Sequence, residues 1–257
     1  MELPLVSIIT PTFNSAKFIL QTIQSVQLQS YKNWELIIVD DCSVDDSVKI
    51  IASAILKDNR IKFIQNQKNS GAGISRNNAL KFANGRFVAF LDSDDLWKPE
   101  KLLKQVNYML LNKVPFTFSF YDCIDENGNS LKRRIEAPKN LTYQKLFYCN
   151  FVGNLTGIYD THFFGKIPIS EIRKRQDWIL WLTILKKIKV SKPIPESLAF
   201  YRVRNDSISS SKFSLIKSNY NVYRLFHQRS IIRSCWCMIC FLFVQLLIKP
   251  RFVKSLQ

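Results

Sequence analysis

Apolar and polar positions follow two alternating patterns through the first half of the chain. Apolar residues that recur every three or four positions, such as Ile19, Ile23 and Val26, predict amphipathic helices. Between these segments lie short continuous apolar runs rich in β-branched residues, which predict buried strands at residues 6–12, 34–41, 61–66 and 86–93. Buried strands that alternate with amphipathic helices indicate an α/β fold with a mostly parallel sheet covered on both faces.

Capping residues predict where the helices of this half begin. Asn14 and Ser15 are predicted to cap the first helix, and the segment SVDD at residues 43–46 the second. The third helix is predicted over residues 73–83. The fourth is predicted to carry Pro99 in its first turn, where proline is tolerated. Each helix is therefore expected to start close to a strand end.

The second half of the sequence is less regular. Residues 116–124 (FTFSFYDCI) predict a strand, residues 126–130 a turn, and residues 176–188 (QDWILWLTILKKI) an amphipathic helix. Residues 191–204 are predicted to be extended. Acidic residues almost vanish after Ser210, and we expect a domain boundary there.

Acidic residues collect where two of the predicted strands end. Asp41 closes the second strand, and the stretch FLDSDDLWKP places Asp92, Asp94 and Asp95 after the fourth. Parallel α/β sheets bind ligands at the carboxyl ends of their strands. Carboxylates this close together raise one another's cost of ionisation, so a positive charge must compensate them.

A divalent cation is one candidate for that positive charge. Residues i and i+2 of an extended segment point the same way, so Asp92 and Asp94 can converge on one Mg²⁺ or Mn²⁺ ion that also binds a diphosphate. The same acids could instead cap the helix near Pro99, and an aspartyl-phosphate phosphatase would also place an acid pair at a strand end. An EF-hand is excluded because Trp97 and Leu103 occupy the positions of its glycine and glutamate.

Two further segments of this half carry candidate ligand contacts. Asp41 could accept a hydrogen bond from a nucleobase ring N–H, or it could cap the following turn. Residues 69–80 (NSGAGISRNNAL) form a glycine-bearing loop that leads into a helix with Arg76 in its first turns, and such a helix start suits an anionic phosphate. The segment matches neither the phosphate-loop motif nor the dinucleotide fingerprint, so it indicates phosphate only in general terms.

The charge of the chain is strongly positive and unevenly distributed. The net charge is +17, and residues 201–257 contain ten Lys and Arg against one acid, Asp206. A basic tail suits either nucleic acid or an anionic membrane surface. It surrounds a fourteen-residue apolar stretch, residues 235–248, which is shorter than the roughly 20 residues that a spanning helix needs. We therefore predict a helix that lies in the membrane interface; the alternative is a final helix packed on the rest of the fold.

Two features of the sequence indicate a cytoplasmic protein. The N-terminal residues, MELPLVSIITPTF, lack the basic region and small-residue cleavage site of a secretory signal. The six cysteines are scattered without a disulfide-like framework, and we expect them to be reduced. Three of them lie in the apolar segment CWCMIC, residues 235–240, and are predicted to pack as small hydrophobic residues rather than to bind a metal.

Four segments in this order and spacing resemble glycosyltransferase family 2: VSIITPTFN, ELIIVDDCSVDDS, NSGAGISRNNAL and GRFVAFLDSDDLWKPEKL. The resemblance implies the GT-A fold, a Rossmann-like, mostly parallel sheet flanked by helices, here followed by a basic helical C-terminal tail. It implies inverting transfer of a sugar from a nucleotide-diphosphate donor, expected to be a UDP-sugar, to a hydroxyl of a saccharide or lipid-linked acceptor. The expected setting is bacterial-type surface polysaccharide or lipopolysaccharide synthesis.

The resemblance also divides the chain into parts. The catalytic domain would span residues 1–210, with a nucleotide-sugar-binding half at 1–105 and an acceptor-binding half at 106–210. Residues 211–257 would form basic, apolar helices that associate with a membrane surface.

Individual roles follow from the same resemblance. Six residues would bind the nucleotide sugar: Pro11, Thr12, Asp41, Arg76, Asp92 and Ser93. Asp94 would be the direct ligand of a divalent cofactor, Mn²⁺ or Mg²⁺, and Asp92 would contact the metal through water or contact the ribose. Asp177 would be the general base that accepts the proton of the acceptor hydroxyl.

The chain departs from the family pattern at two positions. Gln176 stands where glutamate is common, which leaves the assignment of Asp177 as the base intact. Arg204 stands where many relatives have a histidine close to the metal, and neither His162 nor His227 matches that position. Because arginine cannot ligate a cation, Arg204 is predicted to clamp a phosphate oxygen.

Two other functional classes share parts of this pattern with a sugar transferase. A nucleic-acid-binding protein would suit the basic charge, but no recognition motif appears and no nucleic-acid partner is expected. A noncatalytic nucleotide-sugar binder would lack the base, whereas Asp177 is present. We expect a peripheral enzyme at the inner face of the cell membrane.

Overall fold

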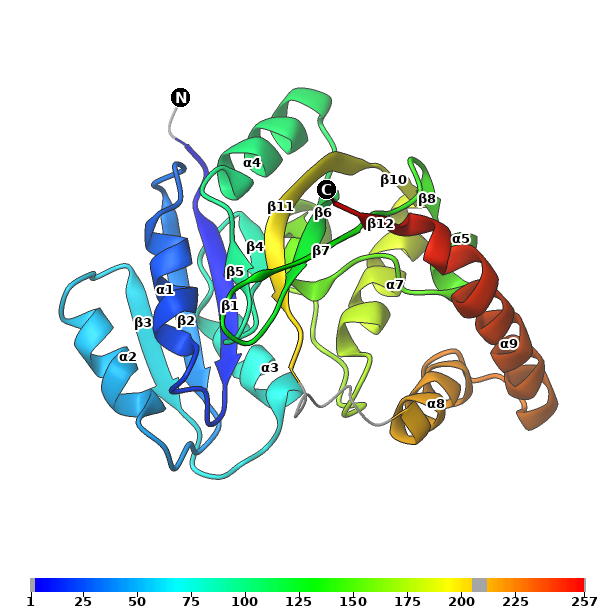
Figure 1. Cartoon of the computed structure of the whole chain (residues 1–257), viewed down its shortest axis with the longest axis horizontal. Coiled ribbons are helices and arrows are strands. Elements are labelled where there is room, and N and C mark those ends of the chain that lie inside the picture. The colour runs from blue at the N-terminus through cyan, green and yellow to red at the C-terminus, as the bar shows by residue number, and fades with distance from the viewer. Residues whose placement is uncertain (1–2, 205–211, 257) are drawn as a thin grey trace.

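A curved mixed sheet runs through the centre of the molecule, with helices on both faces (Figure 1). The computed structural model describes residues 3–204 and 212–256, and within them this sheet has ten strands. Their order is β12-β7-β6-β9-β4-β1-β2-β3, while β11 and β5 lie off this path. The domain boundary predicted near Ser210 lies outside the described residues.

The half of the sheet that comes first in the sequence is parallel. It consists of β1 (Val6–Thr12), β2 (Trp34–Asp40), β3 (Ile61–Gln65) and β4 (Phe87–Phe90). All positions of β1 and β2 are buried, as expected for strands covered on two faces. Thr12 pairs with Asp40, so the carboxyl ends of β1 and β2 meet at one edge of the sheet. The predicted parallel arrangement of the four strands is confirmed.

Helices cover both faces of this parallel half. One face carries α1 (Ile19–Gln27), α2 (Ser47–Ile55) and α4 (Lys101–Asn112), and the other carries α3 (Ala72–Phe82) and α7 (Gln176–Ile188). Successive residues of a strand point to opposite faces, so Ile8 and Ile9 of β1 pack into two different core clusters. The sheet therefore has the two helical layers that the sequence predicts.

The first helix starts later than predicted. α1 begins at Ile19, whereas Asn14 and Ser15 were expected to cap it. Asn14 adopts a left-handed backbone with φ of 46°, and the Ser15 hydroxyl lies 2.7 Å from the Ser93 hydroxyl instead of accepting a helix N–H. Residues 14–18 consequently form a loop that reaches the acidic stretch after β4.

The fourth helix also starts later than predicted. α4 begins at Lys101, so Pro99 precedes the helix and does not lie in its first turn. Leu96–Trp97 form a short strand, β5, that pairs with β11, and the Pro99 carbonyl accepts the backbone N–H of Ser30. These tertiary contacts hold the chain extended before the helix can begin.

The second half of the chain adds mostly antiparallel strands. β6 (Phe116–Ile124) pairs antiparallel with β7 (Ser130–Ile135) and β9 (Ile158–Asp160), and parallel with β11 (Pro193–Arg202). The strand predicted at residues 116–124, the following turn and the extended segment before Arg204 are confirmed. The smaller elements are β8 (Leu141–Thr142) paired with β10 (Val190–Ser191), α5 (Tyr143–Tyr148), a 3-10 turn (Asn154–Thr156) and α6 (Thr161–Phe164).

The helix α7 has the predicted bounds but is not amphipathic. Eight of its residues are buried, including Trp178 and Trp181. One side of α7 packs against the sheet, where Trp181 stacks on Phe116. The other side packs against the C-terminal segment, where Trp178 contacts Phe241. The amphipathic prediction is wrong because the sequence did not reveal this second covering layer.

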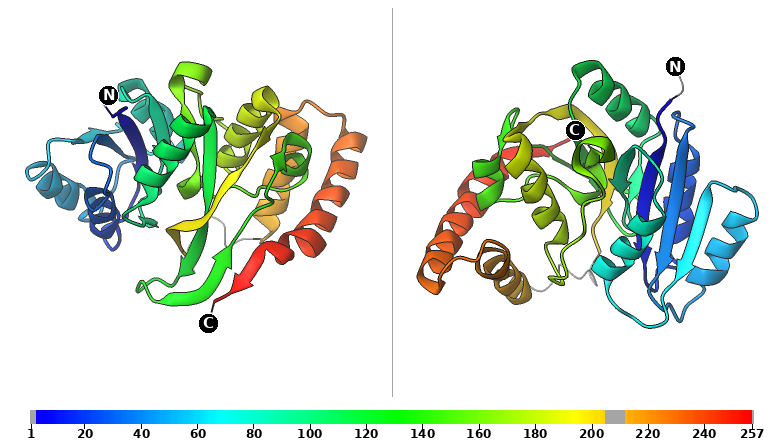
Figure 2. Two further views of the ribbon diagram at one scale, coloured as in Figure 1. Left: turned by 90° about the horizontal axis from the view of Figure 1, so that it is seen from above. Right: turned by 180° about the vertical axis from the view of Figure 1, so that it is seen from behind.

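The C-terminal segment packs along the end of the molecule opposite α2 (Figure 2). It comprises α8 (Lys212–Asn221), a π-helical turn (Val222–Phe226), α9 (Ile231–Phe243) and β12 (Val253–Ser255). The helix that starts as α9 continues to Phe252, and we call residues 231–252 the C-terminal helix. This helix is longer than the apolar stretch at residues 235–248, and by length and composition alone it could cross a membrane, which is weak evidence for a span.

Candidate active site at the strand ends

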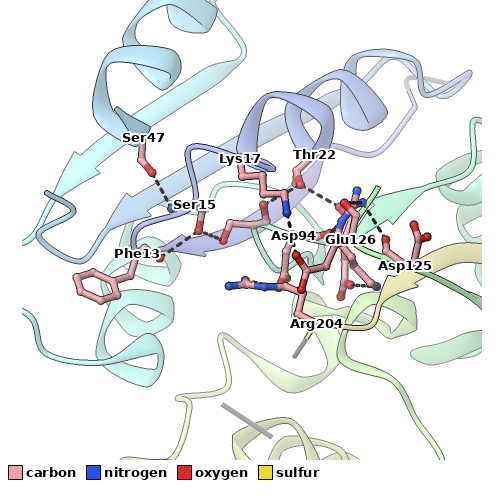
Figure 3. A network of polar contacts seen from close by, with 12 residues as sticks. Phe13, Ser15, Lys17, Thr22, Ser47, Asp94, Asp125, Glu126 and Arg204 are labelled. Carbon is pink, nitrogen blue, oxygen red and sulfur yellow. Dashed lines mark hydrogen bonds and ion pairs between the residues drawn. The ribbon is translucent and has the colours of Figure 1, made fainter. Parts of the chain in front are cut away.

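The acidic stretch after β4 is surrounded by arginines. Asp92 Oδ1 accepts a hydrogen bond from Arg76 Nη2 at 2.5 Å, and Asp94 Oδ2 accepts one from Arg204 Nη1 at 2.9 Å. Figure 3 shows Asp94 facing Arg204, next to the ion pair between Lys17 and Glu126. The positive charge that the acids require is therefore supplied, at least in part, by side chains from α3 and from the end of β11.

The third acid of the stretch binds a buried arginine. Asp95 is 2% exposed, and its Oδ1 accepts the backbone N–H of Arg202 at 2.9 Å. The Arg202 guanidinium is buried and donates to the backbone carbonyls of Asp94, Asp125 and Glu126. Arg202 was not among the site residues predicted from the sequence. The signal was available, because Arg202 and Arg204 have the same i, i+2 spacing as Asp92 and Asp94.

Burial and mutual repulsion perturb two of these carboxyls. Burial raises the pKa of Asp94, the charge of Asp92 raises it further, and Arg204 opposes both effects. Burial raises the pKa of Asp95 well above its usual range, with further contributions from Asp94 and Asp92. Asp95 is therefore a structural group that holds the end of β11, while Asp94 lies nearer the surface, with 24% of its side chain exposed.

The acid at the end of β2 organises the loop before α3. Asp41 is 3% exposed and accepts hydrogen bonds from the Asn66 side chain and from the backbone N–H groups of Ser70 and Gly71, at 2.7–2.9 Å. Gly71 has a φ of 87°, a conformation that favours glycine. Asp41 therefore fixes the loop that leads to Arg76, and its contact with a nucleobase stays a prediction.

The end of β1 lies beside Asp41. Pro11 and Thr12 are buried, and the backbone N–H of Asp41 donates to the Thr12 carbonyl at 2.9 Å. Among the described residues, the buried Thr12 hydroxyl has no hydrogen-bond partner. Such an orphan hydroxyl at a strand end is suited to a ligand contact. Ser93, which was predicted to bind the donor, is 9% exposed and bonds to Ser15.

Gln176 links α7 to the acidic stretch through Arg76. Arg76 Nη1 donates to Gln176 Oε1 at 2.8 Å while its Nη2 donates to Asp92. Gln176 is 6% exposed, and a Cβ added at Gly73 would come within 2.2 Å of its Nε2. Because glutamine is neutral, Asp92 is the carboxylate that Arg76 pairs with here.

The predicted base lies next to this contact, in the first turn of α7. Asp177 is partly buried, and its Oδ2 accepts a hydrogen bond from Asn150 Nδ2 at 2.8 Å. Asn154, which lies four residues after Asn150, donates from its Nδ2 to Asp92 Oδ1 at 3.0 Å. Both asparagines belong to a largely irregular segment whose sequence carries no periodic pattern, so no sequence signal could have identified them.

Two carboxylates remain accessible for a divalent cation. The side chains of Asp92 and Asp94 are 34% and 24% exposed. In residues 3–204 and 212–256, no group of three or more His, Cys, Asp or Glu side chains could hold a metal ion. The pair nevertheless fits Mg²⁺ or Mn²⁺, since such ions bind through one or two carboxylates and take their other ligands from phosphate and water. A cation would also relieve the repulsion that raises the pKa of Asp94.

Known proteins similar to this chain are found by sequence. Residues 7–169 match the family model described as Glycosyl transferase family 2. The chain is 42% identical over 236 residues to the putative teichuronic acid biosynthesis glycosyltransferase TuaG of Bacillus subtilis, which covers 92% of this chain and 94% of that protein. It is 38% identical over 231 residues to the UDP-Glc:alpha-D-GlcNAc-diphosphoundecaprenol beta-1,3-glucosyltransferase WfgD of Escherichia coli, with 89% of each chain covered.

A solved structure resembles the fold as a whole. Residues 1–349 of S. aureus TarS, in complex with UDP-GlcNAc, superpose with a TM-score of 0.72 at 24% sequence identity. The alignment covers 94% of this chain and 73% of that one. At this identity the likeness shows the fold alone, and it confirms the fold class expected from the sequence.

Proposed function

Because this chain belongs to glycosyl transferase family 2, we propose that it transfers a sugar, with inversion, from a UDP-sugar to a hydroxyl of a lipid-linked saccharide. The name of the E. coli relative states a UDP-Glc donor and a GlcNAc-diphosphoundecaprenol acceptor, and that of the B. subtilis relative states teichuronic acid biosynthesis. These names support a role in the synthesis of a bacterial surface polysaccharide.

The observation that carries this proposal is a series of side-chain contacts that runs from the acidic stretch to the residue before the predicted base. Arg76 joins Asp92 to Gln176, and Gln176 directly precedes Asp177. Arginines can bind a diphosphate, and a carboxylate can accept the proton of a hydroxyl. This arrangement supports a diphosphate site that lies close to the proposed base, as sugar transfer requires.

The acceptor side of the reaction depends on Asp177. The acceptor oxygen forms a bond to the anomeric carbon while the bond to the diphosphate breaks, and the diphosphate leaves with the electron pair. Asp177 would accept the hydroxyl proton in this step, since the hydroxyl is too weakly acidic to ionise alone.

The donor side depends on the arginines and the exposed acids. Arg204 would exchange its ion pair with Asp94 for a phosphate oxygen, and Arg76 would lie along the same diphosphate. A Mn²⁺ or Mg²⁺ ion held by Asp94 and Asp92 would supply Lewis-acid neutralisation of the charge that develops on the leaving diphosphate. Ser93 and Asp92 would also border the ribose.

The nucleoside would lie at the carboxyl ends of β1 and β2. The orphan hydroxyl of Thr12 and the adjacent Pro11 support a base contact there, and Asp41 would accept from the ring N–H of uracil. On this basis residues 1–105 form the nucleotide-sugar-binding half, and residues 106–210 the acceptor-binding half.

The exposed face of the C-terminal helix supports a position at the inner face of the cell membrane. Seven large apolar side chains, which we call the exposed apolar face, are between 56% and 82% exposed: Ile231, Ile232, Trp236, Ile239, Phe243, Leu246 and Leu247. Residues 212–257 contain eight Lys and Arg and no acid, which suits anionic lipid. Because Cys237, Met238 and Phe241 on the opposite side pack into the core, the helix would lie along the membrane surface.

The proposal is tested by incubating the full-length protein with a panel of nucleotide sugars and a GlcNAc-diphosphate lipid. We expect transfer from a UDP-sugar in Mn²⁺ or Mg²⁺, its loss in EDTA, and a product whose anomeric configuration is inverted by NMR. A folded protein that neither binds UDP nor transfers any sugar under these conditions would contradict it.

A further inference from the structure

We propose that Asn150 is a positioning residue for Asp177, and that the C-terminal segment, residues 212–255, holds the two side chains against each other. This inference rests on the proposed function, in which Asp177 is the general base. It assigns the C-terminal segment a part in the chemistry as well as a place at the membrane.

The amide of Asn150 has one possible orientation. Its Oδ1 accepts the backbone N–H of Val152 at 3.1 Å, which leaves Nδ2 to donate to Asp177 Oδ2 at 2.8 Å. A hydrogen bond to a carboxylate is shorter and stronger than one between neutral groups. Asn150 therefore fixes the rotation of the Asp177 carboxylate and directs its other oxygen, Oδ1, toward an acceptor hydroxyl.

The residues on both sides of Asn150 contact the C-terminal helix. The Cys149 thiol lies 3.4 Å from Gln245 Oε1, and the Phe151 ring meets the Phe252 ring edge to face with centroids 5.4 Å apart. Residues 149–153 have no regular secondary structure of their own. The C-terminal side chains that they pack against therefore help to determine their position.

The residues around Asp177 contact the same segment. Arg175 Nε donates to Asn219 Oδ1 of α8 at 2.6 Å, and the Trp178 ring packs against Phe241 with centroids 5.7 Å apart. The base and the side chain that orients it are thus each flanked by residues in contact with the C-terminal segment. A base must be held in the productive geometry, since a shift of about 1 Å can cost about 100-fold in rate.

The first experiment replaces the donor of the hydrogen bond. Asn150→Asp keeps the shape of the side chain and an acceptor for Val152, but it cannot donate to Asp177 when ionised. We expect kcat for transfer to fall about 10- to 100-fold, while the KM for the UDP-sugar and the Kd for UDP stay within about 2-fold of wild type. Asn112→Asp, which makes the same change at the exposed end of α4, is the matched control and should match wild type.

The second experiment tests the C-terminal contacts. Gln245→Ala and Phe252→Ala should lower kcat with a water-soluble acceptor, in the same direction but less than Asn150→Asp, again without a change in UDP binding. Gln24→Ala, on the exposed side of α1, is their control. If Asn150→Asp fails to fold, Asn150→Ser removes the same hydrogen bond without adding a charge.

The outcomes separate this inference from the proposed function. Wild-type kcat in Asn150→Asp or Asn150→Ser would overturn the role of Asn150, and wild-type kcat in both C-terminal variants would overturn the role of the segment. In either case the wild-type protein would still transfer sugar. Absence of transfer by the wild-type protein would instead overturn the proposed function.

Discussion

The three aspartates after β4 differ in what surrounds each carboxylate. Asp92 and Asp94 are partly exposed and paired with Arg76 and Arg204, whereas Asp95 is buried and holds the backbone of β11. Substitution of the two exposed acids should therefore affect ligands, and substitution of the buried one should affect stability. The sequence motif alone does not show which of the three carboxylates is buried and which are exposed.

Asp94→Asn tests the metal assignment at this site. The variant should lose Mn²⁺- or Mg²⁺-dependent binding of the donor, and transfer should fall by about 100-fold or more, because an amide is a poor ligand for these ions. The melting temperature should change little, since the Asp94 side chain is 24% exposed. Calorimetric titration of UDP with and without metal measures the effect. Full turnover of the wild-type protein in EDTA would show that no metal is needed.

Asp177→Asn tests the base. The change keeps the size of the side chain but removes its ability to take a proton, so kcat should fall by about 10²–10⁴-fold. Donor binding should persist, because Arg76, Asp92 and Asp94 are untouched. The measurement is kcat and KM with saturating acceptor. A collapse of donor affinity with a near-normal residual rate would assign Asp177 to binding or structure.

At the scale of elements, local sequence patterns predicted individual helices and strands but not the contacts between distant ones. The strands β1 to β4 and the presence of the four helices that follow them were predictable, because the spacing of apolar residues encodes which face of each element is buried. The short strand β5 and the starts of α1 and α4 were not. The spacing of Arg202 and Arg204 marks them as a pair, but it does not reveal their partner, because both reach Asp94 across more than 100 positions. Asn150 and Asn154 lie in a largely irregular segment, where no period marks the side chains that face the site.

The junction between α8 and the C-terminal helix makes the attachment of this segment sensitive to acid. His227 lies among aromatic rings, 4.6 Å from Phe147 and 6.2 Å from Tyr223 by ring centroids. Burial, assisted by the charges of Arg229 and Lys186, lowers the pKa of His227 to about 4. The unfolded chain, with an ordinary histidine, binds a proton at higher pH than the folded one. The contribution of neutral His227 to the free energy of unfolding is therefore fully present above about pH 6.5 and is lost as the pH falls toward 4.

His227→Phe should reduce this pH dependence. Phenylalanine fills a similar volume and cannot take a proton, so the free energy of unfolding should fall less between pH 7 and pH 4.5 than in wild type. Urea unfolding across this range measures the difference. Identical pH profiles for the two proteins would show that His227 does not contribute to acid sensitivity.

At the scale of the whole molecule, the C-terminal helix separates two surroundings. One side packs against α7 and the segment around Asn150, and the other presents the exposed apolar face. Removal of the helix would uncover Trp178 and other core residues, so truncation cannot separate membrane binding from folding. Point substitutions on the exposed face can.

Trp236→Ser combined with Phe243→Ser should weaken binding to anionic vesicles. Both side chains are more than half exposed, so the fold should be retained. Wild-type protein should sediment with vesicles that contain anionic lipid and should be released in part at high salt, because each Lys or Arg near the surface contributes about 1 kcal/mol that salt screens. Leu56→Ser, at a still more exposed apolar site after α2, is the control. Equal sedimentation of all three proteins would contradict the membrane assignment.

The strand that follows the C-terminal helix has a consequence for self-association. β12 is only three residues long and forms the outermost strand beyond β7, with Lys254 opposite Arg134. A long, neutral edge strand would invite the sheets of two molecules to join, whereas a short strand with basic side chains resists such pairing. The short, basic strand β12 therefore disfavours aggregation through this edge of the sheet.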